Sequence, residues 1–86
     1  MDYPYFAQNL KALRLIHHLS RSDLANMVGF SNGSILNWET GRVTPRRSSL
    51  LRLSFFFGEA LEDILYEEKN YVTELDKRMG KSVTVT

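Results

Sequence analysis

The sequence predicts an all-α fold: one compact domain of five short helices over residues 1–66, followed by an extension over residues 67–86. Three observations predict it. Apolar residues recur at spacings of three and four, as on the buried face of a helix. Residues typical of helix starts precede several of these segments, and glycines end the second, third and fourth. With 86 residues, two prolines and five glycines, the chain is long enough for one small core and has the composition of a folded protein.

The first helix is expected to begin at Pro4, because proline at the first helical position loses no hydrogen bond. Asp2 or Tyr3 would be its cap. Helical spacing then divides the side chains between two faces. The buried face would hold Phe6, Leu10, Leu13 and Ile16, and the outer face Gln8, Asn9 and Lys11.

The next two helices follow each other closely. Ser20 and Asp23 have the spacing of a capping box, which starts the second helix, and Gly29 ends it. Ser31 is expected to cap a third helix over residues 31–39, which Gly41 closes. A capped helix, a glycine turn and a second short helix therefore span Leu19 to Gly41.

Two more helices complete the prediction. Thr44 as cap and Pro45 as first residue are expected to start the fourth helix, and Gly58 to end it. Residues 55–57 are three consecutive phenylalanines, more than one helical face can bury, so part of this run is predicted core and part an interface. Leu61, Ile64 and Leu65 are expected to lie on a short fifth helix.

The third helix has one apolar and one polar face. At about 100° per residue, Ile35 and Trp38 fall on one side with Ser34, and the opposite side is narrow and nearly uncharged. Such a helix fits the major groove of DNA, where asparagine pairs bidentately with adenine and an apolar group can meet a thymine methyl. The outward side consists of Asn32, Gly33, Leu36 and Asn37.

Residues 6–66 resemble the lambda-repressor/Cro-like family of helix-turn-helix domains. Many independent positions agree with that family in type and spacing. They are Leu13-Arg14, Leu19-Ser20, Asp23-Leu24-Ala25, Val28-Gly29-Phe30-Ser31, Ile35, Trp38-Glu39, Gly41, Pro45, Leu50 and Leu53.

The resemblance implies a role for each site residue. The base contacts would be made by Asn32, Gly33, Leu36 and Asn37. Backbone amides near the start of the fourth helix would meet phosphate, and Arg46 could also approach the minor groove. Arg14 and Glu39 would form a semi-buried structural ion pair. The side-chain phosphate contacts would be made by Arg21, Ser31, Ser34, Thr40, Arg42 and Arg46.

Two residues depart from the family pattern. Gly33 stands where members usually carry a longer polar side chain, so it either permits close approach of the backbone to DNA or marks a weak reader. Arg21 stands where glutamine is frequent, which adds a positive charge.

Charge is divided unevenly along the chain. Residues 1–57 carry seven Lys and Arg against three Asp and Glu, whereas residues 58–86 carry four against seven. The basic part is expected to face a polyanion and the acidic part solvent or protein.

The sequence gives no support for several other classes of protein. The chain has no cysteine, so neither a disulfide nor a thiolate metal site is available, and a reducing cytoplasm is the expected location. His17 and His18 are adjacent and diverge on a helix, so we expect no metal. No cofactor motif, catalytic constellation or membrane-length apolar run is present, and the segment that opens with Asp2 does not resemble a signal peptide. The sequence therefore predicts neither an enzyme nor a membrane protein.

The predicted function is sequence-specific binding of double-stranded DNA, by a homodimeric repressor of phage or plasmid type that reads a palindromic operator. The alternative is an antitoxin or adaptor that regulates its own synthesis and binds a partner protein through residues 67–86. That extension contains β-favouring segments at residues 71–73 and 83–86, and either a short hairpin or a disordered tail fits it. Apolar residues after Phe55 are expected to supply the dimer contact.

Overall fold

The computed structural model describes residues 3–68, and within them all regular structure is helical. The predicted all-α class and the five helices are confirmed. Any hairpin or tail over residues 69–86 lies outside the described residues. The helices are α1 (Phe6–Ile16), α2 (Arg21–Val28), α3 (Asn32–Glu39), α4 (Arg47–Phe57) and α5 (Leu61–Tyr66).

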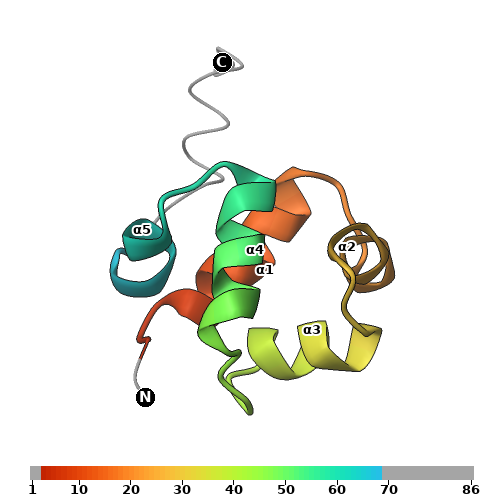
Figure 1. Ribbon diagram of the computed structural model, residues 1–86, viewed down its shortest axis with the longest axis horizontal. Coiled ribbons are helices and arrows are strands. Elements are labelled where there is room, and N and C mark those ends of the chain that lie inside the picture. The colour runs from red at the N-terminus through yellow and green to blue at the C-terminus, as the bar shows by residue number, and fades with distance from the viewer. Residues whose placement is uncertain (1–2, 69–86) are drawn as a thin grey trace, which may run out of the picture.

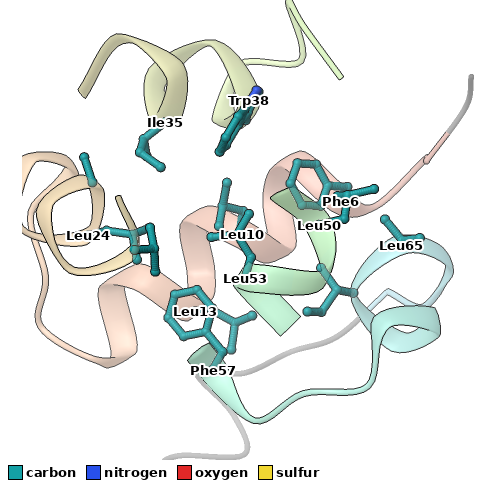
Figure 2. Packing of buried hydrophobic residues seen from close by; sticks show 13 residues of the cluster. Phe6, Leu10, Leu13, Leu24, Ile35, Trp38, Leu50, Leu53, Phe57 and Leu65 are labelled. Atoms are coloured by element: carbon teal, nitrogen blue, oxygen red, sulfur yellow. The ribbon is translucent and has the colours of Figure 1, made fainter. Parts of the chain in front are cut away.

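α1 and α4 cross at the centre of the molecule (Figure 1). α2 and α3 lie on one side of this pair and α5 on the other, and α3 runs beneath the N-terminal end of α4. Each helix turns its apolar face toward the middle, where the side chains form a single core (Figure 2). The core consists of Phe6, Leu10, Leu13, Leu24, Ala25, Val28, Ile35, Trp38, Leu50, Leu53, Phe57, Ile64 and Leu65.

Local capping chemistry determines the ends of α2 and the end of α4. At the start of α2, the backbone N of Asp23 donates to Ser20 Oγ at 2.9 Å, and the backbone N of Ser20 donates to Asp23 Oδ2 at 3.1 Å. The predicted capping box is therefore present. Gly58 ends α4 in the left-handed conformation, as expected for a residue without a Cβ.

The predicted start of α1 was wrong. The helix begins at Phe6, and Tyr5 precedes it without a side-chain cap. Residues 3–5 contact α5 instead: the ring of Tyr3 packs edge-on against Tyr66 at 5.9 Å, and Tyr5 N donates to the carbonyl of Leu65 at 3.4 Å. Asp2, the other predicted cap, lies outside the described residues.

Asn9 was expected to point outward, but it is completely buried. Its Nδ2 donates to the carbonyl oxygens of Ile64 at 2.9 Å and Glu67 at 2.8 Å. These bonds fasten α1 to the end of α5. The packing of α5 on α1 therefore covers a side chain that α1 alone would expose.

The predicted start of α4 was also wrong. The helix begins at Arg47, after Arg46 in extended conformation, rather than at Pro45. Pro45 is buried in the loop that joins α3 to α4, so its ring serves packing instead of helix initiation. The first turn of α4 contains no acidic residue and has no side-chain cap, and two arginines stand at its start.

Within residues 3–68, none of the helices has the length and apolar character needed to traverse a bilayer.

Candidate nucleic-acid interface

The turn between α2 and α3 sets the direction of α3. Gly29 follows α2 with φ of +80°, a conformation that side chains with a Cβ rarely adopt, and its N–H donates to the Ala25 carbonyl at 2.9 Å. Ser31 then caps α3, because its Oγ accepts from the backbone N of Ser34 at 3.1 Å. The two helices thus meet through a turn of three residues.

Arg52 of α4 supports this turn from outside. Its Nη1 donates to the Val28 carbonyl at 2.9 Å, and its guanidinium lies over the Phe30 ring at 4.8 Å from the centroid. Phe30 in turn packs edge-on against Trp38 of α3, with centroids 4.8 Å apart. A chain of contacts therefore runs from α4 through the turn to α3. In the sequence, Arg52 was only counted among the basic residues of 1–57. No local pattern around it indicates that it contacts Val28 and Phe30.

α3 is held by its inner face. Ile35 and Trp38 are buried in the core, as helical periodicity predicted. On the opposite face Asn32 and Gly33 are exposed, Leu36 is 42% exposed, and Asn37 is half-buried. The four predicted base-contact residues therefore lie together on the outward face of α3.

The loop after α3 is fastened to the same helix. The carbonyl of Asn37 accepts from the backbone N of Arg42 at 3.0 Å, from that of Val43 at 3.4 Å and from Thr40 Oγ1 at 3.3 Å. Arg42 is exposed on this loop. These bonds hold the backbone of Arg42 in place relative to the backbone of Asn37.

The hydroxyl groups near α3 differ in what they can donate. Thr40 Oγ1 donates to the Leu36 carbonyl at 2.9 Å, and Ser31 Oγ donates to Ser34 Oγ at 2.9 Å. A hydroxyl has one hydrogen, so Thr40 would have to release its bond to donate to a phosphate. Ser31 and Ser34 share one hydrogen bond between their two hydroxyls, so one of these two hydrogens stays free to donate.

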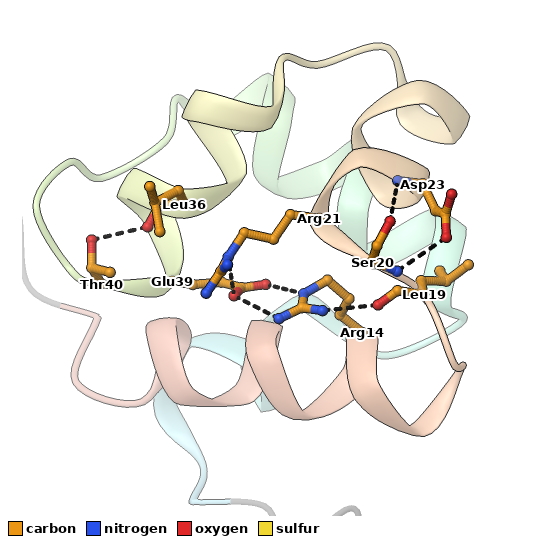
Figure 3. Close-up of polar contacts among 8 residues, drawn as sticks. All are labelled: Arg14, Leu19, Ser20, Arg21, Asp23, Leu36, Glu39 and Thr40. Carbon is orange, nitrogen blue, oxygen red and sulfur yellow. Dashed lines mark hydrogen bonds and ion pairs between the residues drawn. The ribbon is translucent and has the colours of Figure 1, made fainter.

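Arg14 and Glu39 are brought together beneath this surface (Figure 3). Arg14 Nε and Nη2 donate to the two carboxylate oxygens of Glu39 at 2.6 and 3.1 Å, and Nη1 donates to the Leu19 carbonyl at 2.8 Å. The side chains are only 7% and 1% exposed. The pair joins the end of α1 to the end of α3.

Arg21 is a third member of this network, which sequence reasoning missed. Its Nε donates to Glu39 Oε1 at 3.2 Å, and 37% of its side chain stays exposed (Figure 3). Glu39 thus shares one negative charge between two arginines, so this network of three side chains carries one net positive charge. The exposed part of the Arg21 side chain faces solvent.

This geometry agrees with known proteins. Residues 10–64 match the helix-turn-helix family. An uncharacterized HTH-type transcriptional regulator of Methanocaldococcus jannaschii is 37% identical over 60 residues, which are 69% of this chain and 91% of that protein. The chain belongs to the helix-turn-helix family of DNA-binding transcriptional regulators.

Two solved structures share the fold. The DNA-binding domain of the P22 C2 repressor superposes with a TM-score of 0.70 at 26% identity, covering 81% of this chain and 92% of that domain. The SOS-response transcriptional repressor LexA from Eubacterium rectale gives a TM-score of 0.72 at 20% identity, covering 79% of this chain and 72% of that one. The expected likeness to repressor-type helix-turn-helix domains is confirmed.

Proposed function

We propose that the protein is a transcriptional repressor that binds a palindromic operator as a homodimer, with α3 of each copy in the major groove. The observation that carries the proposal is the outward face of α3. The core holds this helix by Ile35 and Trp38, while two asparagines and Leu36 face away from the core. A rigidly held helix that presents amide and apolar groups is suited to reading base edges.

Each residue on this face is proposed to make a particular contact with the bases. Asn32 and Asn37 pair with adenine edges, Leu36 contacts a thymine methyl, and Gly33 lets the backbone approach the bases. These contacts would discriminate between operators. Phosphate contacts, which carry no sequence information, fix the helix in register.

The phosphate contacts surround the reading face. Arg42 and Arg46 are exposed on the loop between α3 and α4, and Arg21 stands at the start of α2. The backbone N–H groups at the start of α4, which has no side-chain cap, contribute a further anion site together with Arg46. The set is completed by the hydroxyl groups of Ser31, Ser34 and Thr40.

The repressor role is supported by the P22 C2 domain, which is 26% identical and belongs to a protein named a repressor. A two-fold dimer is proposed because one domain offers few base contacts, and two half-sites about one helical turn apart bring two recognition helices to one side of the duplex. The adaptor or antitoxin alternative depends on residues 67–86, of which 69–86 lie outside the described residues.

The test is selection of bound duplexes from a random pool by the purified chain. We expect one enriched motif with two-fold symmetry and half-site centres about 10–10.5 base pairs apart. Recovery of no motif would contradict sequence-specific binding. An asymmetric single half-site, saturated by one copy of the chain, would contradict the dimer while leaving the reading helix intact.

A further inference from the structure

A pocket of about 410 Å³ lies between the segment before α1, the first turn of α1 and the loop after α3. This volume is in the range that holds small organic molecules. Tyr3, Phe6 and Trp38 line it with aromatic rings, and Ala7 and Val43 add apolar side chains. The residues proposed to contact bases or phosphate are not among the described residues that line it. The pocket is therefore separate from the proposed DNA interface.

Contacts elsewhere in the fold hold the walls of this pocket in place. Phe6 and Trp38 belong to the core and are only 4% and 7% exposed. The ring of Tyr3 packs edge-on against Tyr66, with the centroids 5.9 Å apart. A pocket whose walls are ordered before binding loses little free energy to ordering when a ligand enters.

Trp38 brings an unpaired hydrogen-bond donor to the pocket. Its indole Nε1 has no acceptor among residues 3–68, although the residue is more than nine-tenths buried. Figure 2 shows this nitrogen on the side of the ring that faces away from Leu10. Buried indole N–H groups usually have a partner, because an unpaired donor has lost its hydrogen bonds to water. The pocket therefore offers a binding position for an oxygen acceptor.

We infer that the pocket binds a small neutral molecule with an aromatic ring and a carbonyl oxygen. The ring packs against the aromatic walls, and the oxygen accepts from Trp38 Nε1, since an indole N–H can only donate. None of the described residues that line the pocket carries a charge, so an ionic ligand would lose its hydration without gaining a counter-charge. The inference does not rest on DNA binding, because it concerns a separate site.

Nuclear magnetic resonance tests the inference directly, because the chain has one tryptophan and therefore one indole N–H signal. Acetophenone, a neutral aromatic ketone, is titrated into the isotope-labelled full-length chain without DNA. We expect a saturable shift of the indole proton to lower field as the hydrogen bond to the ketone forms, with backbone shifts confined to residues around the pocket. Ethylbenzene, which has the ring but no oxygen, is the control and should give no shift to lower field.

Variants locate the binding site. Ala7→Leu adds bulk inside the pocket and should weaken acetophenone binding by about tenfold, because the added side chain occupies the space of the ligand. Ala12→Leu is the matched control, since Ala12 is also half-buried on α1 but does not line the pocket, and it should bind as the unmodified chain does. Val43→Phe, at a residue that is 50% exposed, repeats the test from the loop after α3. Thermal unfolding verifies that each variant folds.

Several results would overturn the inference. A shift that grows without a plateau, or that is the same in Ala7→Leu and Val43→Phe as in the unmodified chain, means that acetophenone does not occupy this pocket. A low-field shift with ethylbenzene means that Trp38 does not donate to the ligand oxygen. Slow exchange of the indole proton with solvent in the free chain means that a residue outside 3–68 already accepts from it. Failure of the proposed function is recognised separately, because the chain would then select no duplex motif.

Discussion

Glu39 connects three helices through one carboxylate, and its two arginines are not equivalent. Arg14 is almost fully buried and binds both carboxylate oxygens, whereas Arg21 binds one oxygen and remains partly exposed. Loss of Arg14 leaves Glu39 beside Arg21. Loss of Glu39 leaves Arg14 buried without its counter-charge.

This asymmetry gives the first prediction. Glu39→Leu should lower the free energy of unfolding by roughly 3–5 kcal/mol, the cost of breaking a buried pair, and Arg14→Leu by less. The double variant with leucine at both positions should be milder than Glu39→Leu, because no buried charge is then left unpaired. Urea unfolding of the single and double variants measures these values. Strict additivity in the double-mutant cycle would mean that the two side chains do not interact.

Gly33 has no conformational reason to be glycine. It does not have positive φ, and an added Cβ would meet only Ser31 Oγ, at 4.0 Å. Gly33→Ala should therefore stabilise the fold by about 0.5–1 kcal/mol, through the helix preference of alanine. We expect affinity for the operator to fall at the same time, since the added methyl would obstruct the approach of α3. Calorimetry and an operator titration separate the two effects. A more stable protein with undiminished affinity would show that Gly33 does not lie against DNA.

Features of the helices that depend on residues close together in the sequence could be predicted. Features that depend on residues far apart in the sequence could not. The caps at Ser20 and Ser31 and the stop at Gly29 were predicted correctly, because each involves groups within a few residues. The burial of Asn9 could not be predicted, since it depends on α5 packing against α1. The start of α4 was missed because Pro45 is buried in the preceding loop instead of starting the helix.

The same distinction holds for the candidate site. The two faces of α3 follow from helical periodicity alone, so the sequence was sufficient to separate Ile35 from Leu36. The links from Arg21 to Glu39 and from Arg52 to Val28 join residues 18 and 24 positions apart. Such links depend on the packed arrangement of helices, and no periodic signal in the sequence encodes them.

The contacts of Arg52 are expected to stabilise the turn between α2 and α3. Arg52→Met keeps an apolar stem over Phe30 but removes the bond to Val28 and the cation–π contact. We expect a loss of about 1 kcal/mol in stability, the sum of two modest surface contributions. Operator affinity should also decrease, because the turn that orients α3 loses its support. Arg47→Met is the control for stability, and equal stability of the two variants would contradict the supporting role of Arg52.

For the whole molecule, the distribution of charge determines how binding responds to salt. The basic residues of the proposed interface come from the start of α2 and from the loop before α4, and the acidic residues 59, 62 and 63 lie on or next to α5. The uneven charge along the sequence thus becomes an uneven charge across the fold.

The salt dependence of binding tests whether these basic residues contact phosphate. With about four to six phosphates neutralised per dimer, the logarithm of the binding constant should fall with the logarithm of salt concentration at a slope of about −4 to −5. Fluorescence anisotropy on a labelled duplex at several chloride concentrations provides the slope. A flat response would exclude a phosphate-contacting surface of this size.

We propose that the outward face of α3 reads the base sequence, while the loop beside it supplies contacts without sequence preference. The most direct measurement is selection from a random duplex pool by Asn37→Ala and Arg42→Ala, compared with the unmodified chain. Asn37→Ala should lose preference at one base pair in each half-site, worth about 1–3 kcal/mol. Arg42→Ala should keep the motif, bind all duplexes more weakly and lower the salt slope by about one. Identical changes in the two selected motifs would contradict the placement of α3 in the major groove.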